Sequence, residues 1–125
     1  MLDSCDLIAF VPTVDLGRAR SFYAGTLGLA LTEQSEYACV FEVNATMLRV
    51  TLVGTAPAAG YTILGWNVPD IVATIRDLAS RGVTFERFDG MVQDDLGIWT
   101  TPDNSRVAWF EDPDGNTLSV TQFAS

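Results

Sequence analysis

Carboxylates, arginines and two cysteines are the side chains with which this 125-residue sequence could do chemistry. It holds 16 aspartates and glutamates, seven arginines, no lysine and no histidine. Without lysine there is no Schiff-base chemistry, and without histidine there is no imidazole base and no serine–histidine or cysteine–histidine nucleophile pair. No other nucleophile or carboxylate pair stands out. The composition therefore excludes several common reaction classes.

The strong negative charge limits the partners of the chain. A net charge of −9 repels phosphate backbones and anionic membrane surfaces, so we expect no nucleic acid and no membrane among the partners. The N-terminus lacks the positive charge of a signal peptide, and the uncharged stretch 50–69 is broken by proline and glycines. Cys5 and Cys39 are too few for a four-thiolate site. We expect a cytoplasmic protein with free thiols.

The elements that must position any site form an internal repeat. Apolar β-rich runs over 7–14 and 61–69 lead into Asp15 and Asp70, which lie 55 residues apart. Each aspartate suits the N-cap of a helix that ends at a glycine, Gly28 or Gly82. Further strands are predicted over 29–32, 37–43, 47–53, 83–86, 106–111 and 117–122. The pattern predicts one α+β domain over 1–125, with two βαβββ modules at 7–54 and 61–123 and a linker at 55–60.

The repeat resembles the vicinal oxygen chelate superfamily of glyoxalases, bleomycin-resistance proteins and dioxygenases. The resemblance rests on stretches that span nearly the whole chain: Val14-Asp15-Leu16, Phe22-Tyr23, Leu27-Gly28-Leu29, Asp70-Ile71, Arg81-Gly82-Val83 and the run from Val107 to Asn116. It implies a mixed sheet that curls around a cleft between the modules, with helices on the outside. Many members form dimers, so the resemblance also implies a homodimer.

Metal-dependent members of that superfamily hold a divalent ion through four strand positions. By the resemblance these positions fall on Ile8, Arg49, Ile63 and Ser119. Isoleucine and arginine are not metal ligands, and serine is a weak one. We therefore expect no metal and no cofactor. A replacement site built from Asp94 and Asp95 is a weaker alternative.

Strand alternation predicts which side chains face the cleft, because every second residue of a strand shares a face. The predicted ligand-binding residues are Arg49, Ser119, Ile8, Ile63, Phe10, Asn67, Thr51, Trp99 and Trp109. Two interpretations of Arg49 stay open. It could form a structural ion pair with Glu42 on the adjacent strand, or it could bind an anionic or carbonyl group of a ligand.

Three tryptophans offer surfaces for stacking. Alternation places Trp66 in the core. Either Trp109 or Phe110 must face inward, and the sequence leaves that choice open. Trp99 lies in the long polar loop 90–105, which would overhang the cleft, and it is the best aromatic candidate for ligand contact.

Several functions are compatible with these residues. The first is a metal-free binding protein of the bleomycin-resistance type that takes a small organic ligand. The alternatives are a metal-dependent lyase, isomerase or dioxygenase, a metal-free enzyme in which Arg49 stabilises negative charge, and a dimeric interaction module. The residues name neither the ligand nor a catalytic group.

Overall fold

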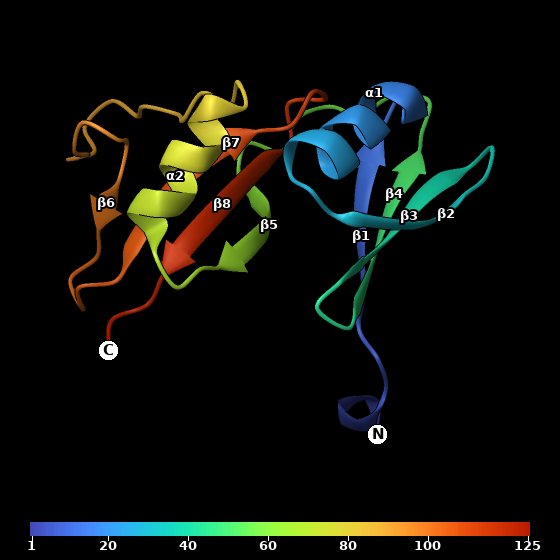
Figure 1. The fold of residues 1–125 in the computed structure, drawn as a ribbon, viewed down its shortest axis with the longest axis horizontal. Coiled ribbons are helices and arrows are strands. Elements are labelled where there is room, and N and C mark those ends of the chain that lie inside the picture. Colours follow the sequence, from blue (N-terminus) through green and yellow to red (C-terminus); the bar gives the residue numbers. More distant parts are fainter. The chain divides into compact units, whose positions relative to one another are not determined.

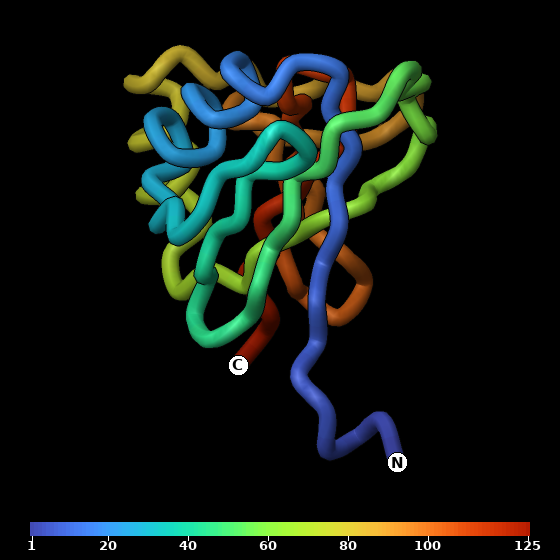
Figure 2. Tube along the Cα trace, turned by 90° about the vertical axis from the view of Figure 1, so that its right-hand side faces the viewer, coloured from blue at the N-terminus to red at the C-terminus, as the bar shows by residue number.

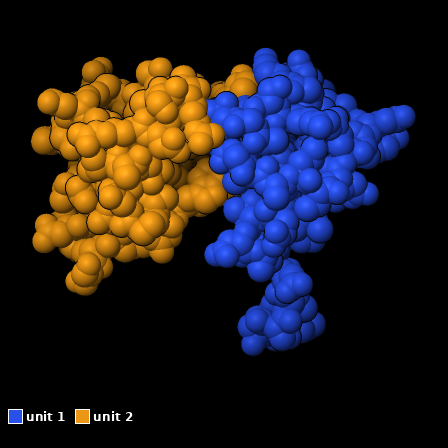
Figure 3. Space-filling model, in the orientation of Figure 1, with its two compact units in different colours: residues 1–57 blue, residues 58–125 orange.

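A computed structural model describes all 125 residues, which form two compact units, Met1–Pro57 and Ala58–Ser125 (Figure 3). The boundary falls inside the segment 55–60. Each unit holds a four-stranded mixed sheet with a helix against one face (Figure 1). No helix has the length and apolar content needed to cross a lipid bilayer.

The first unit has the strand order β1-β4-β3-β2, with β1 parallel to β4 and the other neighbours antiparallel. Its strands are β1 (Ile8–Thr13), β2 (Ala30–Gln34), β3 (Ala38–Val43) and β4 (Thr46–Leu52). Helix α1 (Leu16–Arg20) continues into a π-helical turn, Ser21–Thr26. A short 3₁₀ turn, Leu2–Ser4, precedes β1, and the N-terminal segment extends away from the sheet (Figure 2).

The second unit repeats this plan with the order β5-β8-β7-β6, in which β5 is parallel to β8. Its elements are β5 (Thr62–Asn67), α2 (Ile71–Ser80), β6 (Trp99–Thr100), β7 (Arg106–Glu111) and β8 (Thr117–Gln122). Figure 1 shows α2 lying across its sheet. The tandem βαβββ architecture predicted from the repeat is therefore confirmed.

Both predicted helix caps are present. The Asp15 carboxylate accepts a hydrogen bond from the Arg18 amide (3.0 Å), and the Asp70 carboxylate accepts one from the Ala73 amide (3.1 Å). Each bond satisfies an amide that has no partner within its helix, which explains why both helices begin where they do. Gly28 follows the first helical segment with a positive φ of 72°, as its predicted terminal role requires.

The core of each unit lies between its helix and the facing side of its sheet. In the first unit this side carries Val11, Phe41, Leu48 and Val50, all buried, and the Tyr23 ring packs 6.0 Å from the Phe41 ring. In the second unit the buried residues are Ile71, Ile75 and Leu78 of α2 with Ala108, Phe110, Leu118 and Val120 of the sheet. Trp66 pairs with Val120 on this side, which confirms its predicted orientation.

The strand expected over 83–86 does not form. Only Phe85 makes an isolated bridge, with Phe110, and the fourth strand of the second sheet is instead β6, which pairs with β7. The chain leaves the sheet because the loop before β6 crosses close to Phe85. A Cβ placed on Gly97 would lie 3.4 Å from the Phe85 Cβ. The Gln93 side chain also ties the loop to the Glu86 and Gly97 carbonyls.

Candidate functional site

One side of the first sheet, here called the Arg49 face, carries four of the predicted ligand-binding residues, Ile8, Phe10, Arg49 and Thr51. The register of β1, β4 and β3 arranges this face in three cross-strand rows. The rows are Ile8–Met47–Glu42, Phe10–Arg49–Val40 and Pro12–Thr51–Ala38. The opposite side holds the apolar core under α1. The predicted alternation of β1 and β4 is therefore confirmed.

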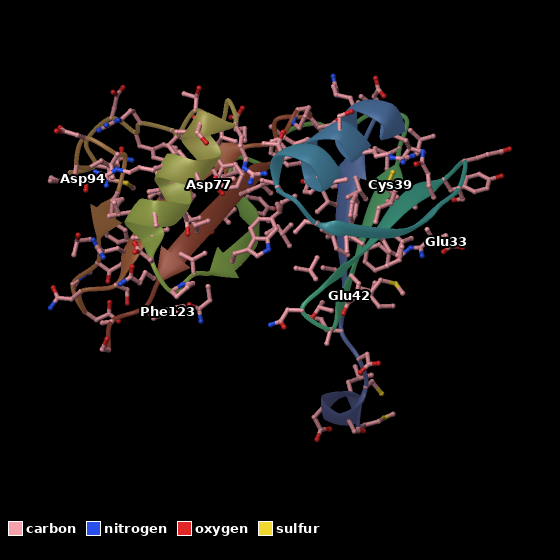
Figure 4. All side chains as sticks on the ribbon, in the orientation of Figure 1. Glu33, Cys39, Glu42, Asp77, Asp94 and Phe123 are labelled. Atoms are coloured by element: carbon pink, nitrogen blue, oxygen red, sulfur yellow. The ribbon has the colours of Figure 1, made fainter.

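Arg49 lies at the centre of the Arg49 face and is half-buried. Its guanidinium group makes no hydrogen bond or ion pair with another side chain or with the backbone. Glu42 lies in a neighbouring row at the hairpin end of β3 (Figure 4), where its Oε1 accepts a hydrogen bond from the Ala45 amide at 3.1 Å. The structural ion pair between Arg49 and Glu42 is therefore not formed. Thr51 lies two residues further along β4. Its Oγ1 is buried and also has no hydrogen-bond partner.

A groove of about 390 Å³ lies at the end of the Arg49 face where β3 turns into β4, with Ile8 and Met47 in its lining together with the carboxylates Asp6 and Glu42. Four of the side chains that line it, Ile8, Met47, Val40 and Glu42, belong to the Arg49 face. Phe10, next to Arg49 in the central row, is 63% exposed. The unpaired guanidinium thus lies beside an exposed aromatic ring, one row away from the Ile8 and Met47 side chains that line the groove.

The equivalent side of the second sheet, here called the Trp109 face, carries the other predicted site residues except Ile63. Its central row is Gly65–Ser119–Trp109, and the next row is Asn67–Thr121–Val107, with Trp99 paired to Val107. Phe110 points the other way and is 1% exposed. The structure therefore places Trp109, rather than Phe110, on the same face as Ser119.

Aromatic rings gather at the β6–β7 end of the Trp109 face. The Trp99 and Trp109 ring centroids lie 6.3 Å apart at an interplanar angle of 32°, and the Phe88 ring meets Trp109 edge-on at 5.5 Å. The Trp109 indole N–H donates to Thr62 Oγ1 at 3.0 Å, which fixes the indole. A smaller hollow of about 270 Å³ lies against Trp99 and the loop that carries Asp94 (Figure 4). The half-buried indoles form a platform suited to stacking with a planar group.

Thr62 is a residue of the Trp109 face that the sequence did not indicate. A bulge in β5 leaves Ile63 without a partner in β8, because Thr62 pairs with Thr117 and Leu64 pairs with Leu118. Thr62, instead of Ile63, therefore stands beside Trp109. No sequence signal marks the bulge, since the residue is an ordinary isoleucine within an apolar run.

Gly65 lies next to Ser119 at the centre of the Trp109 face. A Cβ at this position would lie 2.6 Å from Ser119 Oγ, so any side chain would displace that hydroxyl. Ser119 itself is only 7% exposed. The absence of a side chain at Gly65 thus lets the Ser119 hydroxyl pack against the β5 backbone.

We expect Gly65→Ala to lower the free energy of unfolding by about 1 kcal/mol, because the new methyl group overpacks Ser119. In a Ser119→Ala background the same change should be neutral or slightly stabilising, since the clashing oxygen is gone and alanine restricts the unfolded chain. Urea denaturation of the four proteins in this double-mutant cycle measures the coupling. A coupling near zero would contradict the close approach of Gly65 to Ser119.

The side chains at the four resemblance-derived metal positions do not fit a divalent cation. Two are isoleucines, one is a guanidinium that would repel the ion, and one is a largely buried serine. No group of three or more histidine, cysteine, aspartate or glutamate side chains is placed to hold an ion elsewhere. Asp94, from the proposed replacement pair, accepts hydrogen bonds from the Leu96 and Ile98 amides and so shapes its own loop.

The Cys39 thiol does not offer a reactive site. Cys39 is buried on the helix side of β3, and its thiol donates to the Leu16 carbonyl at 3.8 Å. Burial raises the pKa of the Cys39 thiol, and the positive charge of Arg20 offsets only part of that rise. The thiol therefore stays protonated at neutral pH. Cys5 is exposed in the N-terminal segment.

Comparison with known proteins agrees with this architecture. The sequence matches the Glyoxalase/Bleomycin resistance protein/Dioxygenase superfamily over residues 4–120. A superfamily member from Sphaerobacter thermophilus DSM 20745 shares 24% identity and a TM-score of 0.75, covering 98% of this chain and 99% of that chain. A putative glyoxalase family protein from Bacillus anthracis is 17% identical in sequence and matches with a TM-score of 0.74. The match covers 95% of this chain and 94% of that chain.

The structural likeness extends to a protein described as lactoylglutathione lyase from Agrobacterium tumefaciens. It shares 18% identity and a TM-score of 0.70, covering 95% of this chain and 93% of that chain. No curated protein matches in sequence. The two βαβββ units and the match over nearly the whole length define the class: the chain belongs to the Glyoxalase/Bleomycin resistance protein/Dioxygenase superfamily.

Proposed function

We propose that this chain is a metal-free member of the superfamily that binds a small organic ligand. The observation that carries the proposal is Arg49. A permanent cation stands at a position where the resemblance places a metal ligand, and no acidic side chain neutralises it. A fixed positive charge at this position repels a divalent cation and therefore disfavours metal binding there.

The Trp109 face supplies the contact surface for the ligand. Trp109 and Trp99 offer ring faces for stacking, and Ser119, Thr62 and Asn67 offer polar groups. Small-molecule sites typically combine such apolar surface with a few placed polar groups. The two remaining expectations, a cytoplasmic location and a homodimer, belong to the same proposal.

A metal-free enzyme is the second candidate, and the unpaired guanidinium of Arg49 is the observation that favours it. A positive charge that no protein group neutralises can stabilise negative charge that develops on a substrate. Metal-dependent lyase, isomerase or dioxygenase chemistry has no such support, because the donor set does not suit the ion.

The first test measures metal content and probe binding on the intact chain. Elemental analysis should give far less than one metal per chain, and nickel, zinc, iron or manganese should not raise Tm. One equivalent of tightly held metal that raises Tm would overturn the proposal.

Isothermal titration with naphthalene-2-carboxamide, a neutral planar probe, tests the Trp109 face. We expect Trp109→Ala to weaken binding tenfold or more, because a truncated aromatic anchor loses both burial and stacking, worth about 2 kcal/mol or more. Trp66→Phe, a change on the helix side of the same sheet, is the matched control and should retain wild-type affinity. Equal affinity in the Trp109→Ala and wild-type proteins would contradict the assignment of this face.

A further inference from the structure

We infer that the Arg49 face is a subsite for the carboxylate of an aromatic or other apolar carboxylic acid. This inference rests on the proposed binding function and deepens it, since it names the chemical class of the ligand. The geometry that carries it lies entirely within the first unit, on β1, β4 and β3.

The first argument is the unmet bonding capacity of Arg49. A guanidinium carries five N–H donors in a planar fork that matches a carboxylate, and a half-buried one without a partner is costly. The protein provides no partner for it. Thr51 Oγ1, on the same face and two residues along β4, is a second polar group without one. Two neighbouring unsatisfied donors favour a ligand that accepts hydrogen bonds.

The second argument is the distribution of charge and apolar surface across the three rows. Glu42 stands at the end of the row that also holds Ile8 and Met47, and its carboxylate would repel an anion placed there. An anionic group is therefore directed to Arg49 and Thr51. The groove of about 390 Å³ beside Ile8 and Met47 is left for the uncharged part of the ligand. The face thus orients a molecule with one anionic end and one apolar end.

The third argument concerns the shape of the uncharged part. Phe10 lies directly opposite Arg49 in the parallel β1–β4 pair and is 63% exposed. Its ring flanks any group that is bonded to the guanidinium. A planar ring next to the carboxylate can contact Phe10 while the rest of the ligand covers Ile8 and Met47. An aromatic monocarboxylate satisfies all of these features.

The charge of the whole chain further restricts the class. At a net charge of −9 the chain repels dianions and polyanions more strongly than a monoanion, whose single charge the local pair with Arg49 neutralises. We therefore expect one carboxylate rather than a phosphate or a dicarboxylate.

The experiment compares naphthalene-2-carboxylate with naphthalene-2-carboxamide, which has the same ring system and no charge. Isothermal titration at neutral pH and 0.15 M salt measures both affinities for the intact chain. We expect the carboxylate to bind about tenfold to a hundredfold more tightly, the range typical of a hydrogen-bonded ion pair.

Arg49→Met keeps an unbranched apolar side chain and removes the guanidinium with its charge, and it should abolish the preference for the carboxylate. Arg49→Lys should retain only part of the preference, because an ammonium cannot form the two parallel bonds of a guanidinium. Arg76→Met, an exposed change on α2, removes the same charge from the other unit and should leave both affinities unaltered. Ile8→Asn should weaken binding of the carboxylate, because it removes apolar surface from the groove.

A carboxylate that binds no better than the amide, or a preference that survives Arg49→Met, would overturn the subsite. In that case, loss of amide binding in Trp109→Ala would still leave the proposed function standing. If neither probe binds at millimolar concentration, both the subsite and the Trp109 assignment fall. Circular dichroism of each variant confirms that a lost affinity is not a lost fold.

Discussion

Replacing Phe110 by alanine is expected to lower the free energy of unfolding by about 3–5 kcal/mol, the range for truncation of a buried aromatic side chain. Phe110 is 1% exposed, pairs with Leu118 across the sheet and packs its ring 5.4 Å from that of Phe85. The truncation removes the largest buried side chain of the second unit and leaves a cavity under α2. Urea denaturation monitored by circular dichroism gives the difference.

Trp109→Ala, one residue earlier, is the matched comparison. The indole is half-buried on the opposite face, so its loss should cost about half as much or less, although tryptophan is the larger residue. Equal losses at the two positions would show that both rings belong to the core. The assignment of the Trp109 face would then fail together with the predicted order of stability.

The second large effect is expected at the turn between β7 and β8. Asp112 is buried, and its carboxylate accepts hydrogen bonds from the Asp114 amide (2.9 Å), the Asn116 amide (2.9 Å) and the Asn116 side-chain amide (2.8 Å). Asp112→Ala removes the acceptor and leaves buried donors unsatisfied. We expect the free energy of unfolding to fall by about 2–4 kcal/mol.

Asp112→Asn offers a graded comparison, because one oxygen remains to accept from the two backbone amides. It should lose roughly 1 kcal/mol, mostly through the bond with the Asn116 side chain. Asp89→Ala, an exposed loop change, controls for the removal of a negative charge and should stay within about 0.5 kcal/mol of wild type. A loss below about 1 kcal/mol in Asp112→Ala would contradict the role of its carboxylate in this turn.

Regular features of the fold were predictable because they depend on local chemistry and on periods of two and 3.6 residues. The capping carboxylates of Asp15 and Asp70 and the alternation along β1, β4 and β8 all follow from such rules. These rules did not decide whether Trp109 or Phe110 faces the core. Both are aromatic, so only the register of β7 against β8 separates them.

Irregular features were not predictable. The bulge at Ile63 changes the pairing by one residue, and nothing in an apolar run encodes where an extra residue is accommodated. The ion pair between Arg49 and Glu42, one of the two interpretations of Arg49, is absent for a related reason. In the β3–β4 hairpin, Asn44 and Ala45 adopt positive φ angles, and Glu42 bonds the Ala45 amide three residues away. A local bond of this kind competes with a cross-strand ion pair.

The π-helical turn Ser21–Thr26 carries information about the history of the repeat. The stretch from Asp15 to Gly28 is one residue longer than that from Asp70 to Gly82, and a π-turn is the structure that accommodates a single extra residue within a helix. If both halves descend from one duplicated ancestor, an insertion in the first copy was absorbed inside the helix. The two copies then diverged, one toward a guanidinium and the other toward indoles.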